Sequence, residues 1–303
     1  MFYKDGEFYS VSATENRFLV GGGNEEALLH NIKKDSMDAI VDVLEESVIF
    51  CKILEEKEEC HFLVVTVAGM ICLMTENRSI NILEIKESVS TVVFIKNNLY
   101  IGTEIGNVYV YTSELEHINT VVTDCLILDI QISDEYVFIL NDNGVYISDK
   151  YGNIIATKEI KNISSLKCID GKVYGISVND KFYVYKENTK LFEMSTEETV
   201  DSINFIDNSF VLGGMFDGFI FVNISNYTVF KMNVELNCIK DIRIFDRYKI
   251  IFIYEDTKIG IIDVRDKNSL FIVEPHVGLI FDFDFTMNYI IAGGVDGYET
   301  ISI

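Results

Sequence analysis

The chain has 303 residues, of which 48 are acidic and 25 basic, so its formal net charge is −23 at pH 7. A hydrophobic content of 49% is normal for a globular core and excludes a disordered chain. Phosphate backbones and anionic lipids repel so acidic a protein. We therefore expect no direct binding to nucleic acid or membranes, and we expect a basic partner.

Short apolar runs separated by polar turns recur along the whole chain, which is typical of β-strands. No convincing amphipathic helix interrupts them. In chain order, groups of three strands are predicted to begin near Phe8, Ser47, Ser88, Cys125, Ile163, Thr199, Cys238 and Val277.

The turn between the second and third strand of each group recurs at a nearly constant interval. Successive turns are 36 to 40 residues apart, which is the period of a four-stranded propeller blade. Glycine is favoured in such turns because a two-residue hairpin requires a left-handed backbone. The second turn residues are Gly69, Gly106, Gly144, Asp180, Gly218, Thr257 and Gly297.

The strand count predicts an all-β, closed β-propeller that forms one domain over residues 1–303. Eight groups of three strands are present, only seven fourth strands lie between them, and the chain ends after a third strand, Glu299–Ile303. If Phe2–Lys4 supply the missing strand, the N-terminus closes the last blade and no open sheet edge remains. We therefore predict eight blades, with seven, the commoner number, as the alternative.

Motifs of catalysis and cofactor binding are not found. Gly21-Gly22-Gly23 lacks the Lys-Ser/Thr of a phosphate-binding loop, and the last group has Gly293-Gly294 in the same place. These glycines are therefore interpreted as sites where neighbouring strands pack closely. Without a Gly-x-Ser-x-Gly elbow either, we expect no enzyme activity, no catalytic residue and no cofactor.

The six cysteines form no Cys-x-x-Cys pair and mostly lie in apolar runs, and the four histidines are not spaced as metal ligands. We expect reduced, buried thiols and no metal site. The sequence has neither a secretory signal nor an apolar stretch of about 18 residues that could span a membrane. A cytoplasmic location is predicted, with the nucleus as a second compartment.

The last group carries a recognisable motif. His276, Ile280, Phe283 and Phe285 follow the pattern His-x3-hydrophobic-x2-hydrophobic-x-hydrophobic, and residues 290–297 read as a second strand and its turn. In this spacing the group resembles the WD40 family. The Trp-Asp pair that gives the family its name is missing from every blade. The resemblance implies a propeller fold for the whole chain and a structural hydrogen bond for His276.

Charge is predicted to gather on one face of the propeller, where the loops between blades meet the turns between second and third strands. Acidic residues outnumber basic ones by 17 to 4 in these segments, and the opposite face is close to balance. Turns favour Asp for backbone reasons, but this does not explain the glutamates. Carboxylates at the starts of inner strands, and two Phe rings that could stack on Arg, complete the predicted binding set. Its members are Glu46, Glu87, Glu104, Asp124, Asp129, Glu198, Asp201, Phe216, Asp241, Phe281 and Asp282.

Three stretches resemble one WD40 subfamily, the dedicated ribosomal-protein chaperones of fungi and their animal relative, the angio-associated migratory cell protein. They are residues 18–24 with Ala27, residues 46–49 with Cys51, and residues 276–279 with 282–283. The resemblance implies an acidic, eight-bladed protein that holds the basic N-terminal segment of a large-subunit ribosomal protein until assembly. We also expect a monomer. The alternative is a scaffold subunit of a coat, nuclear-pore or translation-initiation assembly, which would expose an apolar contact surface.

Overall fold

The regular elements of the chain are β-strands arranged as eight separate sheets. The computed structural model describes residues 6–41, 46–56, 59–169 and 171–303, and within these ranges it contains 31 strands and no helix. Seven sheets have four strands and one has three, and sheet order follows chain order in each. This confirms an all-β chain with eight blades rather than seven. The strand predicted at Phe2–Lys4 lies outside the described residues.

The chain divides into two compact units, residues 1–119 with 275–303 and residues 120–274, and the boundary falls within β12. One domain over residues 1–303 stays a prediction. The first unit contains β1 (Phe8–Ala13), β2 (Arg17–Gly22), β3 (Ala27–Asn31), β4 (Ser36–Val41), β5 (Val48–Glu56), β6 (Cys60–Thr66), β7 (Met70–Thr75), β8 (Ser79–Glu84), β9 (Val89–Ile95), β10 (Asn98–Thr103), β11 (Asn107–Thr112), β12 (His117–Val122), β29 (Ile280–Phe285), β30 (Tyr289–Gly294) and β31 (Gly297–Ser302). The second contains β13 (Ile127–Ile132), β14 (Tyr136–Asn141), β15 (Gly144–Asp149), β16 (Ile154–Glu159), β17 (Ile163–Cys168), β18 (Val173–Val178), β19 (Lys181–Lys186), β20 (Thr189–Ser195), β21 (Val200–Ile206), β22 (Ser209–Gly214), β23 (Phe219–Asn223), β24 (Val229–Met232), β25 (Ile239–Ile244), β26 (Lys249–Tyr254), β27 (Lys258–Asp263) and β28 (Asp266–Val273).

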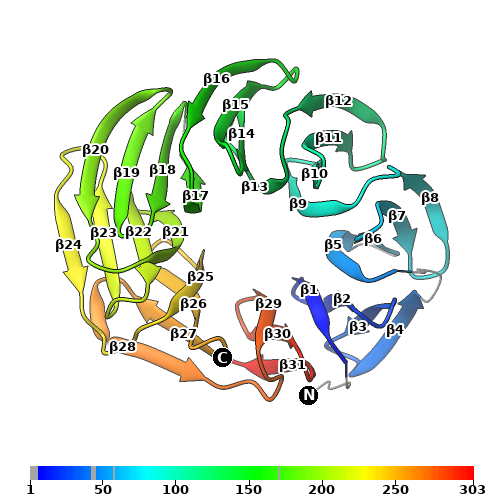
Figure 1. Ribbon diagram of the computed structural model, residues 1–303. Helices are drawn as coiled ribbons and strands as arrows, with labels where there is room; N and C mark the ends of the chain where they lie inside the picture. The colour runs from blue at the N-terminus through cyan, green and yellow to red at the C-terminus, as the bar shows by residue number, and fades with distance from the viewer. Residues whose placement is uncertain (1–5, 42–45, 57–58, 170) are drawn as a thin grey trace. The chain divides into compact units, whose positions relative to one another are not determined.

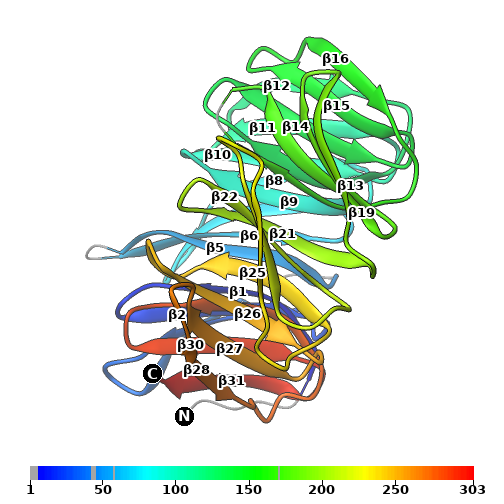
Figure 2. The ribbon, with the colours of Figure 1, turned by 90° about the vertical axis from the view of Figure 1, so that its left-hand side faces the viewer.

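Each unit buries its apolar residues between neighbouring sheets. In the first unit, separate clusters fill the spaces from β29–β31 to β1–β4, from β1–β4 to β5–β8, and from β5–β8 to β9–β12. The last blade therefore packs on the first, red beside blue in Figure 1. In the second unit, equivalent clusters join the four consecutive sheets from β13 to β28, and Figure 2 shows β25–β28 as one such sheet.

Burial follows the position of a strand in its sheet. The second strands, such as β6, are buried along their length because neighbouring sheets cover both faces, and they read as continuous apolar runs. The fourth strands, such as β8, are mostly exposed. This gradient explains why the first three strands of each blade were easier to predict than the fourth.

Glycines occur where the backbone or a neighbouring strand leaves no room for a side chain. A Cβ at Gly22 would lie 1.8 Å from the carbonyl oxygen of Glu7, and one at Gly21 would lie 2.3 Å from Val48 Cγ1, which confirms the close-packing interpretation for these two glycines. Gly69 has a φ of 93° in its hairpin turn. In a turn without glycine, Asn179 takes the left-handed conformation with a φ of 54°.

Side chains of the inner strand, which is the first strand of each sheet, form hydrogen bonds to the neighbouring blade. An inner strand has only one neighbour in its sheet, so the N–H groups along its other edge need partners from elsewhere. Ser10 and Ser12 of β1 accept hydrogen bonds from backbone N–H groups of β5, at 2.9 and 3.1 Å. Asp282 and Asp284 of β29 accept in the same way from β1, at 2.7 and 2.9 Å, and Ser202 of β21 accepts from β25 at 2.9 Å. We call these contacts inter-blade latches.

A buried arginine adds an ionic link between the first two blades. Arg17 of β2 is only 10% exposed, and its Nε lies 3.0 Å from Asp38 of β4. Its two Nη atoms lie 2.6 Å from Glu76, after β7, and 3.8 Å from Glu56 of β5. Burial disfavours the charged form of Arg17, but the hydrogen bond that Arg17 donates to Asp38 and the charge of Glu76 outweigh this effect and raise the pKa of the guanidinium.

Candidate partner-binding surface

The predicted binding residues divide between the two units. Glu46, Glu87, Glu104, Phe281 and Asp282 belong to the first unit and the other six belong to the second. Glu46 lies just before β5 and Glu104 lies in the β10–β11 turn. Both are exposed, and neither forms an ion pair with another residue in the described part of the chain. Their carboxylates are therefore available to a partner.

Glu87 is held by its own blade. Its carboxylate accepts hydrogen bonds from the Tyr109 hydroxyl at 2.6 Å and from Asn107 Nδ2 at 3.1 Å. Burial alone would raise the pKa of Glu87, but these bonds to the charged form outweigh it and lower the pKa. Conversely, burial and the bond to Glu87 raise the pKa of Tyr109 to about 12. Glu87 therefore stays ionised and stabilises its own blade through these hydrogen bonds, a role that the sequence did not indicate.

Phe281 lies at a β-bulge that recurs near the start of the inner strands. The bulge residue is Phe281 in β29, Tyr9 in β1 and Asp201 in β21. Phe281 is 44% exposed, its ring centroid lies 5.2 Å from that of Tyr9, and the Tyr9 hydroxyl donates to the Glu7 carboxylate. Sequence reasoning missed Tyr9 and Glu7, although the equivalent bulge position would have identified Tyr9. Two rings beside a carboxylate form a surface on which an Arg side chain can stack and be neutralised.

Asp282 has a structural role that the sequence did not indicate. Its Oδ2 accepts from the Val11 N–H in an inter-blade latch, and its Oδ1 accepts from the Phe283 N–H at 2.9 Å. Asp129 occupies the equivalent position of β13, where Ile130 N–H and the Gln131 amide donate to it. Burial raises the pKa of Asp129, and these bonds oppose the rise. Both carboxylates are half-buried acceptors with part of their bonding capacity already used.

In the second unit, two predicted acids have basic neighbours. The Lys240 ammonium forms an ion pair with Asp256 at 2.7 Å. Its positive charge also lowers the pKa of Asp201, but burial has the larger effect and the pKa of Asp201 is raised. Arg243 pairs with Asp241 at 2.6 Å. The predicted charge balance counted only bases in loops and turns, so it missed these two on inner strand β25. The acidic character there is weaker than predicted.

The remaining predicted residues of the second unit differ in how far their side chains are exposed to solvent. Asp124 and Glu198 are exposed in the loops before β13 and β21, and Glu198 has no ion pair with a residue of the described ranges. The Tyr146 hydroxyl donates to Asp124 at 3.3 Å. Phe216, by contrast, is half-buried against the apolar cluster between β17–β20 and β21–β24. It presents less ring surface than Phe281 because that cluster covers it.

The cysteines and histidines contribute no binding centre. No two of the six cysteines are joined in a disulfide, and four of them are buried. Cys125 and Cys238 are half-exposed, so the prediction that all six are buried is wrong for these two loop residues. His276 is tied to Glu299 through its backbone N–H at 2.6 Å, while its ring is largely exposed. The described residues contain no group of three or more His, Cys, Asp or Glu that could hold a metal ion.

Comparison with known proteins places this geometry in a family. The sequence profile of the WD40-like domain matches residues 6–301. No curated protein sequence matches the chain. Within the described ranges, no helix has the length and apolar character required to cross a membrane.

Several solved structures share the fold at low sequence identity. Sqt1 from Saccharomyces cerevisiae is 14% identical, with a TM-score of 0.79 over 100% of this chain and 99% of its own. Sqt1 from Chaetomium thermophilum, bound to the N-terminus of the ribosomal protein L10, is 11% identical, with a TM-score of 0.83 over 99% and 98%. The computationally designed Ika8 protein is 13% identical, with a TM-score of 0.82 over 100% and 98%. At such identities the likeness shows the fold alone.

Proposed function

Because the chain belongs to the WD40-like family, we propose that it is a non-catalytic binding protein that holds a basic segment of a newly made large-subunit ribosomal protein. The observation that carries the proposal is the set of exposed loop glutamates, Glu46, Glu104 and Glu198, which have no cation partner among the described residues. The structure of Chaetomium thermophilum Sqt1 with the N-terminus of ribosomal protein L10 supports the choice of partner. We further propose a monomer in the cytoplasm, and also in the nucleus, that does not bind nucleic acid directly.

The proposed contacts divide into weak and stronger ones. An exposed ion pair contributes only about 0.2–1 kcal/mol, so the loop glutamates must act together and mainly accelerate association. Half-buried Asp201 and the rings of Tyr9 and Phe281 exclude more water, and contacts made there contribute more. We expect binding to weaken steeply with salt, because the field of many carboxylates attracts the basic segment.

Calorimetric titration with a synthetic peptide of the ribosomal protein L10 N-terminus tests the proposal. Glu198→Lys removes one attraction and adds one repulsion, so we expect a loss of affinity of roughly three- to tenfold. Glu135→Lys makes the same charge change at an exposed residue of the opposite face and should change affinity less than twofold. Equal losses in both variants would leave only nonspecific attraction. Undetectable binding of the unaltered protein at physiological salt would reject the proposal.

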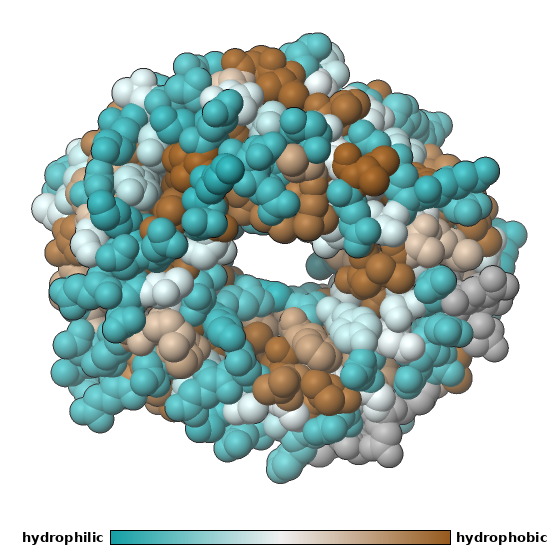
Figure 3. Space-filling view, viewed as in Figure 1, coloured by the Kyte–Doolittle hydropathy of each residue, from teal (hydrophilic) through white to brown (hydrophobic). Residues whose placement is uncertain are grey.

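A scaffold subunit is the second candidate, and one observation favours it. Large apolar side chains are exposed on the fourth strand of seven blades, and Figure 3 shows apolar residues on one face as separate groups among polar ones. Such residues could contact permanent partners. They are Met37, Ile40, Ile80, Ile82, Ile118, Val122, Ile154, Ile155, Leu191, Val229, Phe230, Phe271 and Ile272. A salt-resistant complex recovered from cells would support this candidate over the chaperone.

A further inference from the structure

A groove on the second unit lies between the blade of β21–β24 and the blade of β25–β28. It consists of two adjoining hollows of about 270 and 390 Å³ that share Phe230 and Val264. Both are open to solvent. The first volume lies below, and the second in the lower part of, the roughly 300–1,000 Å³ typical of pockets that enclose a whole ligand. The groove therefore fits side chains of a peptide better than a complete small molecule.

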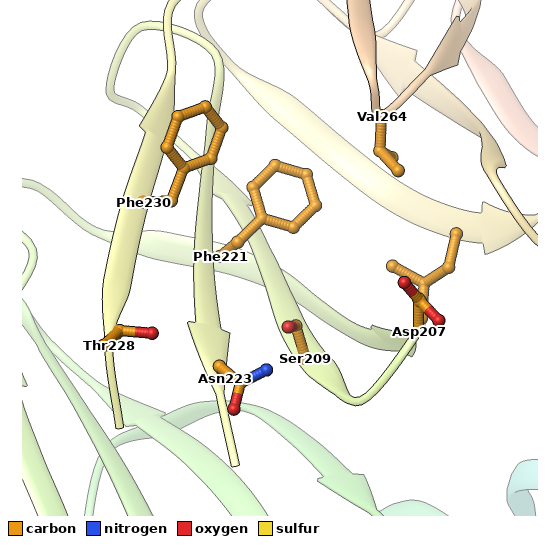
Figure 4. Close-up of a pocket in the computed structure, with 8 residues that line it drawn as sticks. Asp207, Ser209, Phe221, Asn223, Thr228, Phe230 and Val264 are labelled. Atoms are coloured by element: carbon orange, nitrogen blue, oxygen red, sulfur yellow. The ribbon is translucent and has the colours of Figure 1, made fainter. Parts of the chain in front are cut away.

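The first hollow has an apolar side formed by Ile206, Phe221, Phe230 and Val264, and a polar side formed by Asp207, Ser209, Asn223 and Thr228. Phe221 of β23 and Phe230 of β24 are cross-strand partners whose ring centroids lie 6.1 Å apart. Figure 4 shows both rings directed into the same space, with Val264 of the next blade reaching toward it. Phe221 and Val264 are anchored against the core, but Phe230 is 60% exposed. An exposed phenylalanine above a hollow costs free energy in water that a bound apolar side chain would recover.

The second hollow has a basic lining. Lys231, Arg265 and Lys267 contribute to it and no carboxylate lines it, although the Lys231 ammonium pairs with Glu197 outside the hollow at 3.5 Å. This is unusual in a chain in which acidic residues outnumber basic ones by 48 to 25. Arg265 is held in place by Asp263 and by the Tyr248 ring, 3.7 Å from its guanidinium carbon. Lys267 is exposed and forms no ion pair with a described residue.

We propose that this groove is a docking site for a short acidic peptide segment of a partner protein. An aromatic or branched aliphatic side chain of the segment packs on Phe221, Phe230 and Val264. Adjacent Asp or Glu side chains lie against Lys231, Arg265 and Lys267. The proposal does not depend on the ribosomal-protein function, because the charge that it requires in a ligand is the opposite one.

Selection from a phage-displayed library of 12-residue peptides with net charges of −3 or lower tests the proposal on the full chain. We expect enrichment of peptides with an apolar residue flanked by carboxylates. The leading peptide is then labelled with fluorescein and titrated by anisotropy. Phe230→Ala should weaken its binding at least tenfold and Lys267→Glu roughly three- to tenfold.

Matched variants separate the groove from general effects on the protein. Val229→Ala is the control for Phe230→Ala. Val229 precedes Phe230 in β24 and is 43% exposed, but it does not line the groove. Lys186→Glu makes the same charge change as Lys267→Glu on β19, away from the groove. Both controls should bind within twofold of the unaltered chain.

Three results would overturn the proposal. The first is a selection that enriches no peptide, and the second is an enriched peptide that binds Phe230→Ala as tightly as the unaltered chain. The third is a concentration-dependent dimer in sedimentation that Phe230→Ala abolishes, since the groove would then be covered by a second copy of the chain.

Discussion

Replacing Arg17 with Met should destabilise the chain strongly, because three carboxylates would lose their shared cation. Asp38, Glu56 and Glu76 have side-chain exposures of 13, 17 and 20%, so water can compensate only partly for the loss. Removing one partner of a buried ion pair typically costs about 3–5 kcal/mol. We therefore expect Arg17→Met to lower the free energy of unfolding by about 3–5 kcal/mol. Urea denaturation followed by circular dichroism measures the change, because the chain has no Trp to report by fluorescence.

Arg265→Met is the matched control. Arg265 also contacts a carboxylate with two nitrogen atoms, but its side chain is 59% exposed. Solvent screens such a pair, so its loss should lower the free energy of unfolding far less than Arg17→Met does. If the two variants lost the same small amount, the Arg17 cluster would contribute no more than a surface pair and the burial argument would be refuted.

Three further predictions concern other contacts. Glu87→Gln should reduce stability at neutral pH by about 1 kcal/mol. Because the pKa of Glu87 is lowered in the folded protein, the stability difference should vanish as the pH falls below the usual pKa range of a glutamate. A variant that stayed equally destabilised in acid would count against this assignment. Asp282→Ala should cost about 1.5–3 kcal/mol in urea unfolding, with Asp282→Asn retaining part of the latch; equal stability of all three proteins would show that the latch is unimportant. In the native protein Cys238 should react with a thiol reagent at neutral pH much faster than Cys51, whose pKa burial raises to about 12, and mass spectrometry after partial labelling would expose the reverse order.

The fold could be predicted almost completely from the sequence, because repeated strands leave a repeated signal. Apolar runs give the buried second strands, and glycine turns such as Gly69 and Gly218 give the period. The fourth strands were harder, since β24 has only four residues and three of them are exposed. An exposed strand is specified by hydrogen bonding to its neighbour and leaves little apolar pattern.

The binding surface could be predicted only in part. Exposed loop glutamates such as Glu198 follow from position in the repeat. The pairing of Asp241 with Arg243, and the latch at Asp282, depend on which way a bulged strand turns each side chain. A count of charges per loop carries no such information. The groove beside Phe230 was also missed, because it joins Phe221 and Phe230 to Val264 of the next blade, and no local sequence pattern marks a contact over that separation.

The inter-blade latches have a consequence for how such a chain can evolve. Each latch joins a side chain of one repeat to a backbone N–H of the next, and every residue except proline supplies that donor. Only one of the two positions is therefore constrained, and a substitution on the donor side leaves the bond intact. Repeats joined in this way can drift apart in sequence without coordinated changes. This accounts for a chain that keeps the period of its family while it has lost the family's tryptophans, and whose single proline leaves almost every donor in place.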